Sequence, residues 1–146
     1  EFICGIYGIT KEEAAGKTED MIKRCSLGEI AGKKAGTLSG GWQRRLSIAM
    51  ALISEPDILF LDEPTLGLDV MARRELWEMI EGLKGKVTVV LTTHYLEEAE
   101  SLSDRIGIMA GGRLSAVGTA EELMKKAGKE KFEEAFVVLC RGGSLS

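Results

Sequence analysis

The sequence has few of the residues that would stabilise a secreted or membrane-spanning protein. It contains three cysteines, Cys4, Cys25 and Cys140, which are scattered and odd in number. This pattern argues against a disulfide framework and fits a reducing cytosol. The longest uninterrupted apolar runs, such as Ile48 to Ile53, are too short to span a membrane. With 45% hydrophobic and 29% charged residues, the 146-residue chain is expected to be globular and to have its own core.

A phosphate-binding loop of the form G-x-x-x-x-G-K-[ST] is also absent from the sequence. Gly16-Lys17-Thr18 has the tail of that motif, but Lys11 stands where its first glycine would be. The segment lies inside a predicted helix that begins with the capping box Thr10 to Glu13 and has no strand before it. We therefore expect Lys17 to be a solvated surface residue that does not bind phosphate.

Positive charge is too sparse to suggest nucleic acid as a partner. The formal net charge is −4. Residues 1–54 carry eight Lys or Arg against six Asp or Glu, and the remainder carries eleven against seventeen. Neither part is strongly basic, so we expect no nucleic acid to bind. Arg44 and Arg45 are expected to belong to a solvated helix face.

The order of the expected elements favours an α/β domain. Residues 1–54 are predicted to be helical, with one helix that begins near Ser39 and ends before Pro56. Apolar and β-branched runs then alternate with helical patterns, which is typical of a mainly parallel sheet. The expected strands cover 58–61 and 86–92, both buried, followed by a hairpin of 105–109 and 113–117. The expected helices cover 70–83, 95–102, 119–128 and 130–140.

Two adjacent carboxylates, Asp62 and Glu63, follow the first expected strand. Adjacent residues at a strand end point to opposite sides, so one carboxylate can hold Mg²⁺ through water while the other faces a different group. In nucleotide hydrolysis, that second carboxylate can orient and deprotonate the attacking water. An acidic pair at an ordinary strand-to-loop junction is the structural alternative. The apolar strand before the pair and Pro64-Thr65 after it favour the catalytic interpretation.

A glycine-rich turn, Ser39-Gly40-Gly41, opens the helix that precedes this strand. Free backbone N–H groups and the helix dipole favour an anion at a helix start. Glycines let the backbone approach phosphate oxygens without a Cβ in the way. An ordinary serine N-cap with a glycine turn would have the same sequence, so the tripeptide alone leaves both interpretations open.

His94 is the only histidine, and it follows the strand that ends at Thr92. Ligand-facing side chains emerge at this end of the strands in open α/β sheets, and a neutral imidazole there could hydrogen-bond a γ-phosphate and the attacking water. A local helix cap and a metal site with Glu98 are the alternatives. The metal site is disfavoured because no other His or Cys lies nearby. Asp69 is a candidate N-cap for the helix that begins at Val70.

Taken in order, these residues resemble the nucleotide-binding domain of ATP-binding cassette (ABC) transporters. Four segments carry the resemblance: the signature segment (38–43), the Walker B segment (58–63), the D-loop (66–69) and the switch histidine, His94. Trp42 is a mild departure from the usual signature. Residues 92–100 are most similar to ATPase subunits of bacterial multidrug-type exporters. Because the Walker A region is missing and the chain begins at Glu1 with helix-like residues, the resemblance is to the C-terminal part of the domain.

The resemblance implies a fold, two cofactors and a set of site residues. The fold would be a partial P-loop NTPase, with a helical signature subdomain at 1–54 and the rear of the ATPase core at 55–146. The cofactors would be ATP and Mg²⁺. The implied site residues are Glu63 and His94 for catalysis, Asp62 for Mg²⁺ through water, Leu38, Ser39, Gly40, Gly41 and Gln43 for ATP bound by a partner chain, and Gly67, Leu68 and Asp69 in the D-loop.

The implied function is that of an ATP-hydrolysing subunit that powers export. Two such chains would dimerise head to tail, contact a transmembrane permease, and lie on the inner face of the cell membrane. Without a Walker A loop, this chain alone is expected to be inactive. Two alternatives stay open: an ABC-type ATPase of DNA repair or translation, and a non-catalytic module that completes a partner's ATP site.

Overall fold

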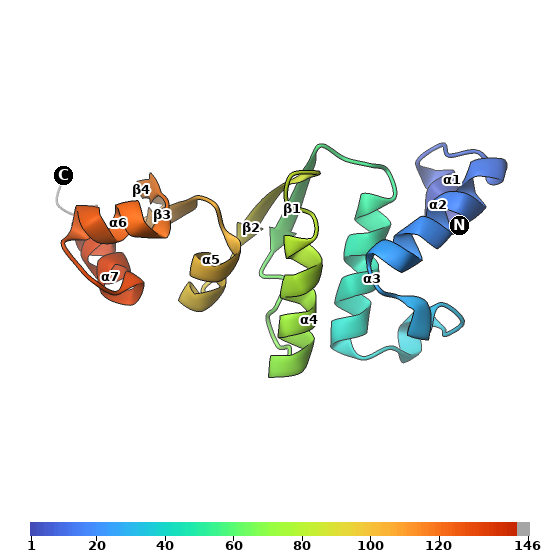
Figure 1. The fold of residues 1–146 in the computed structure, drawn as a ribbon, viewed down its shortest axis with the longest axis horizontal. Helices are drawn as coiled ribbons and strands as arrows, with labels where there is room; N and C mark the ends of the chain where they lie inside the picture. The colour runs from blue at the N-terminus through green and yellow to red at the C-terminus, as the bar shows by residue number, and fades with distance from the viewer. Residues whose placement is uncertain (143–146) are drawn as a thin grey trace. The chain divides into compact units, whose positions relative to one another are not determined.

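The structure, a computed structural model, describes residues 1–142 and divides the chain into two compact units (Figure 1). The first unit covers Glu1–Thr92, and the second begins at Thr93. Helices and parallel strands build the first unit, whereas an antiparallel hairpin and helices build the second. The α/β fold class predicted from the sequence is confirmed. The predicted subdomain boundary between residues 54 and 55 stays a prediction.

The first 54 residues are helical, as expected. They contain α1 (Phe2–Ile6), α2 (Lys11–Arg24), the 3-10 turns η1 (Gly28–Ile30) and η2 (Ala35–Thr37), and α3 (Gly40–Leu52). The predicted capping box begins α2, because the Thr10 hydroxyl accepts from the Glu13 N–H and the Glu13 carboxylate accepts from the Thr10 N–H. Lys17 lies within α2 and forms a 2.7 Å ion pair with Glu55. This hydrogen bond and the ammonium charge lower the pKa of the exposed Glu55 carboxyl.

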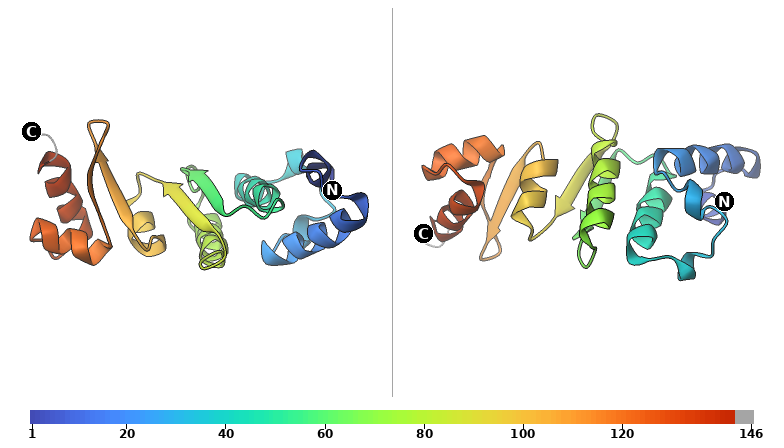
Figure 2. Two further views of the ribbon diagram at one scale, coloured as in Figure 1. Left: turned by 90° about the horizontal axis from the view of Figure 1, so that it is seen from above. Right: turned by 60° about the horizontal axis from the view of Figure 1, so that its bottom comes forward.

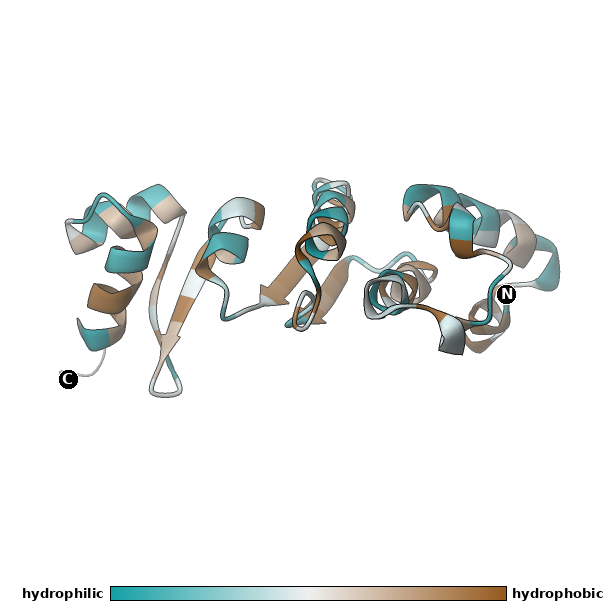
Figure 3. Ribbon diagram, turned by 90° about the horizontal axis from the view of Figure 1, so that it is seen from below, coloured by the Kyte–Doolittle hydropathy of each residue, from teal (hydrophilic) through white to brown (hydrophobic). Residues whose placement is uncertain are grey.

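A parallel pair of strands forms the sheet of the first unit. β1 (Ile58–Asp62) pairs with β2 (Thr88–Thr92), and Figure 2 shows the two strands with α4 (Val70–Glu81) beside them. Both strands are strongly apolar (Figure 3). The expectation that both strands are buried is wrong: Leu59 and Leu61 of β1 are buried, whereas Phe60 is 74% exposed, and every residue of β2 is exposed or half-buried. Side chains alternate along a strand, and within the described residues only one face of this pair is covered.

Helix α4 begins with the N-cap predicted at Asp69. One carboxylate oxygen of Asp69 accepts hydrogen bonds from the Met71 N–H at 2.9 Å and the Ala72 N–H at 3.0 Å. The first backbone N–H groups of a helix have no partner within the helix, so these bonds satisfy two of them. Inward-facing residues then hold α4 against the unit, and Leu76 is fully buried.

Replacing Asp69 with alanine is expected to lower the free energy of unfolding by about 1 kcal/mol, because both cap bonds are lost. Urea unfolding of the complete gene product measures this loss. Asp69→Asn is the matched control, since its amide oxygen can still accept from the same N–H groups. Equal losses in the two variants would contradict the capping role.

The second unit packs a hairpin against three helices. β3 (Ile106–Ala110) and β4 (Arg113–Gly118) pair antiparallel across a turn in which Gly111 and Gly112 both have positive φ, so the predicted hairpin is confirmed. The helices are α5 (Leu96–Leu102), α6 (Ala120–Ala127) and α7 (Phe132–Gly142). The core of this unit contains Ile106, Ile108, Ala116, Leu123, Phe132 and Leu139. Among residues 1–142, no helix is both long and apolar enough to cross a membrane.

Candidate functional site

The carboxyl ends of β1 and β2 place Asp62 beside Thr92. The two residues are register partners in the parallel pair, and the Thr92 hydroxyl donates a hydrogen bond to the Asp62 carboxylate. The Glu63 N–H donates to the Thr92 carbonyl at 3.0 Å and lies 3.3 Å from the Thr92 hydroxyl. Asp62 is exposed and Glu63 is half-buried. The acidic pair therefore lies at the edge of a parallel sheet where ligands bind in α/β proteins.

The backbone at Glu63 is unusual. Its φ is +43°, in the left-handed region that non-glycine residues rarely adopt. The turn that follows is held by a hydrogen bond from the Leu66 N–H to the Glu63 carbonyl at 3.1 Å, and both Pro64 and Thr65 are buried beneath it. Residues in sparsely populated backbone regions cluster at active sites and ligand clamps, so this feature marks Glu63 as a functional candidate.

The signature segment forms the start of α3. Ser39 is the exposed N-cap residue, but its side chain makes no capping hydrogen bond. A different side chain links the first turn of α3 to the residues before it: the side-chain amide of Gln43 donates to the Leu38 carbonyl at 3.1 Å. The alternative of an ordinary serine cap therefore does not describe this hydroxyl. The Ser39 hydroxyl therefore does not cap α3, and it can hydrogen-bond a ligand instead.

The two signature glycines lie against the D-loop and the start of α4. A Cβ added at Gly41 would lie 2.9 Å from the Cβ of Ala72, closer than real Cβ atoms approach one another. A Cβ at Gly40 would lie 3.9 Å from the side chain of Leu68. Gly41 is thus needed for helix packing, a role that the sequence analysis missed. The structure brings residues 38–43 and 66–69 together within the first unit.

The D-loop itself is a tight turn between β1 and α4. Gly67 has φ +76°, which favours glycine, and the Leu68 N–H donates to the Thr65 carbonyl at 3.1 Å. Asp69 then caps α4. Every D-loop residue predicted for the site therefore has a local structural role as well, and the geometry is compatible with both roles.

His94 belongs to the second unit, where it precedes α5. Its ring is exposed and lies against Tyr95, with 4.2 Å between the ring centroids. The Thr93 hydroxyl accepts from the Tyr95 N–H at 3.0 Å, so Thr93 forms the local turn that was one alternative for His94. The described residues contain no group of three or more His, Cys, Asp or Glu side chains that could hold a metal.

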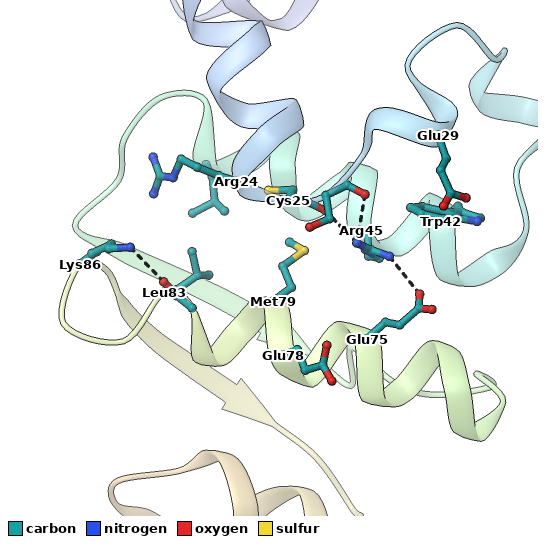
Figure 4. Close-up of a pocket in the computed structure, with 13 residues that line it drawn as sticks. Arg24, Cys25, Glu29, Trp42, Arg45, Glu75, Glu78, Met79, Leu83 and Lys86 are labelled. Carbon is teal, nitrogen blue, oxygen red and sulfur yellow. Dashed lines mark hydrogen bonds and ion pairs between the residues drawn. The ribbon is translucent and has the colours of Figure 1, made fainter.

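Arg45 is not on a solvated face, contrary to the sequence-based expectation. It is 7% exposed, and its guanidinium stacks over the Trp42 ring at 4.4 Å (Figure 4). It donates to Glu75 on α4 at 3.0 Å and to the carbonyls of Cys25 and Ser26 at 2.9 Å and 3.2 Å. The expectation failed because the acceptors that satisfy Arg45 come from distant parts of the sequence. The burial of Arg45 could have been predicted from its position, because it lies one helical turn after Gly41 on the packed face of α3.

These contacts surround a cavity of 580 Å³ in the first unit. Arg24, Glu78 and Lys86 contribute charges to its lining, and Cys25 also lines it. Burial raises the pKa of the Cys25 thiol, and the positive charges of Arg24 and Arg45 oppose that shift. The neutral thiol is therefore favoured, which is the behaviour of a packing residue and not of a nucleophile.

The residues at the tip of β1 suit a magnesium ion whose other ligands are water molecules and substrate phosphates. Asp62 offers an exposed carboxylate, and its hydrogen bond from Thr92 fixes the orientation. Mg²⁺ binds oxygen ligands, keeps several waters and is commonly held by one or two carboxylates together with substrate phosphates. A single carboxylate fits that mode of binding.

Comparisons with known proteins agree with the motif order. A family model described as "ABC transporter" matches residues 6–66. Daunorubicin resistance ATP-binding protein DrrA3 of Streptomyces coeruleorubidus is 41% identical over 99% of this chain and 45% of its own length. ABC transporter A family member 11 of Arabidopsis thaliana is 45% identical over 86% of this chain and 13% of its own length. The chain thus spans less than half the length of either relative.

A solved structure described as the ATP-binding subunit of an ABC transporter has the same fold. It superposes with a TM-score of 0.75 at 27% sequence identity, covering 94% of this chain and 59% of the solved chain. The sequence relatives, the family model and this structural likeness all point to one family. The chain therefore belongs to the ATP-binding proteins of the ABC transporter family.

Proposed function

We propose that this chain is part of an ATP-hydrolysing subunit that powers an ABC exporter. The observation that carries the proposal is the acidic tip of β1, where Thr92 orients Asp62 and the left-handed backbone of Glu63 sets a second carboxylate beside it. DrrA3 is named for daunorubicin resistance, which supports export as the direction of transport.

Each carboxylate has a distinct part in the proposed reaction. Asp62 would hold Mg²⁺ through water, and the ion would supply charge neutralisation for the transferred phosphoryl group. Glu63 accepts a proton from the attacking water and orients it. His94 hydrogen-bonds the γ-phosphate side of the site. In the sequence, His94 is the second residue after the end of β2.

The signature segment serves a second ATP-binding chain in this proposal. The first N–H groups of α3 and the Ser39 hydroxyl face an anion, and the glycines allow its close approach. Two chains then bind two ATP molecules head to tail, and their closure drives a transmembrane permease at the inner face of the membrane. The chain tested alone would not hydrolyse ATP, since it carries no phosphate-binding loop of the Walker A form.

Phosphate release by the complete gene product tests the proposal. We expect Mg²⁺-dependent ATP hydrolysis that falls by at least about 100-fold when EDTA removes the ion, since the metal neutralises the developing charge. Residues 1–146 expressed alone serve as the inactive comparison. Equal hydrolysis with and without Mg²⁺, or no hydrolysis by the complete protein, would refute the proposed function.

A further inference from the structure

Arg45 connects three helices of the first unit, two of which, α3 and α4, border residues of the proposed site. From α3 its guanidinium reaches Glu75 on α4 and the carbonyls of Cys25 and Ser26 at the end of α2. Figure 4 shows these bonds converging on one buried side chain. Because Arg presents its N–H donors in a rigid fork, these contacts fix the relative position of the three backbones more firmly than a single hydrogen bond would.

The connection lies one helical turn from the point where Gly41 on α3 faces Ala72 on α4. Gly41 faces Ala72, and Arg45, four residues later, pairs with Glu75, three residues after Ala72. Residues three or four apart lie on the same face of a helix. The two helices are thus held at two successive points, next to the signature segment on α3 and the D-loop before α4.

The Arg45–Glu75 pair is asymmetric in burial. The side chain of Arg45 is 8% exposed, whereas that of Glu75 is 49% exposed. A buried guanidinium needs several acceptors to offset its lost hydration, so removing one of them weakens the whole arrangement. Removing Glu75 leaves the two carbonyl bonds to α2 in place. This substitution therefore removes one of the two points that hold α3 against α4 and leaves the packing of Gly41 against Ala72 in place.

We propose that Arg45 is a positioning residue that holds the signature segment in a fixed relation to the D-loop, so that the signature segment can reach a partner's ATP. The proposal rests on the proposed function, in which residues 38–43 serve the ATP of a second chain. Arg45 acts through the backbones of α3 and α4 and touches no nucleotide. Loosening it should therefore slow turnover while leaving the binding of ATP by the chain's own Walker B side unchanged.

The test compares Glu75→Ala with Glu78→Ala in the complete gene product. Glu78 lies on the same helix and lines the same cavity, but the hydrogen bonds of Arg45 go to Glu75, Cys25 and Ser26. For Glu75→Ala we expect kcat to fall about tenfold or more, since small misplacements cost such factors, with the Kd for ATP within about twofold of the unsubstituted protein. Glu78→Ala should change neither quantity. The kcat of Glu75→Gln, which keeps an acceptor oxygen, should lie between the values of Glu75→Ala and Glu78→Ala.

Amide hydrogen exchange, measured without nucleotide, tests independently of ATP hydrolysis whether Arg45 holds the two segments in place. Glu75→Ala should raise exchange in both 38–43 and 66–72 by about threefold or more, because local openings become easier there. The hairpin 106–118 is the internal reference. Unchanged exchange in either segment, or a kcat equal to that of Glu78→Ala, would overturn the positioning role. If the unsubstituted protein hydrolyses no ATP, the proposed function itself fails, and the exchange result still decides whether Arg45 couples the two segments.

Leu123→Ala controls for a general loss of stability. Leu123 is fully buried in the core of the second unit and has no part in the proposed site. Its substitution should lower the Tm at least as much as Glu75→Ala does, because truncating a buried leucine leaves a cavity. If Leu123→Ala reproduced both the fall in kcat and the exchange change at 66–72, the effect of Glu75→Ala would be one of stability and the proposal would be wrong.

Discussion

Replacing Glu63 with glutamine is expected to lower the rate of ATP hydrolysis by the complete gene product by at least about 100-fold, the usual contribution of a positioned general base. That factor corresponds to about 2.7 kcal/mol of transition-state stabilisation. The amide of glutamine has nearly the same size and can still orient water, but it cannot accept the proton. ATP binding should be preserved, because the contacts of Asp62 with Thr92 do not involve the Glu63 side chain.

Single-turnover phosphate release and titration with a fluorescent ATP analogue separate the two effects. Glu97→Gln is a matched control, since Glu97 is an exposed glutamate in the first turn of α5. It should leave both the rate and the Kd unchanged. A Glu63→Gln protein that turns over at the normal rate would show that another group is the base. Weaker ATP binding with normal turnover would instead assign Glu63 to nucleotide recognition.

Replacing Gly41 with alanine is expected to reduce hydrolysis by about 10- to 100-fold, through a displacement of α3 of the order that costs such factors. The new methyl group would lie 2.9 Å from the Cβ of Ala72, so the helices must separate or tilt. Overpacking of this kind also destabilises a protein by about 1 to 3 kcal/mol. A fall in Tm should therefore accompany the loss of activity.

The double substitution Gly41→Ala with Ala72→Gly distinguishes packing from phosphate approach. It removes the methyl group that the new Cβ would meet, so the helix spacing can be restored while Cβ at position 41 remains. Recovery of both Tm and turnover would assign the glycine to packing. Recovery of Tm alone would show that a Cβ at position 41 also obstructs the anion. Ala72→Gly by itself is the control, and it should cost only the lower helix propensity of glycine, up to about 1 kcal/mol.

The elements that depend on local sequence were predictable. The capping box at Thr10 and the N-cap Asp69 lie where the sequence placed them, and the helix expected at 119–128 begins at a capping box of its own, at Thr119. Each of these features is formed by residues two or three positions apart, so the neighbouring sequence is sufficient to predict it. The α/β class followed in the same way from the alternation of apolar and helical patterns.

The features that depend on distant residues were not predictable. Arg45 was placed on a solvated face because its three acceptors come from α2 and α4. The exposure of Phe60 on β1 depends on which elements cover the sheet, which a continuous apolar run does not specify. The backbone of Glu63 could not be foreseen either, since a glutamate after a strand gives no sign of a positive φ. The candidate site residues could be named from the sequence and stay a prediction, whereas the long-range contacts that hold them could not be predicted.

The bond between Thr92 and Asp62 has a consequence for biosynthesis. Its two partners lie 30 residues apart, with the whole of α4 between them. Contacts of such separation form late, because the loop between the partners must close first. During synthesis both carboxylates leave the ribosome well before the strand that orients them, since chains grow at only about 5 to 20 residues per second. A nascent chain that stops short of Thr92 would contain Asp62 and Glu63 but would lack the hydrogen bond that orients Asp62.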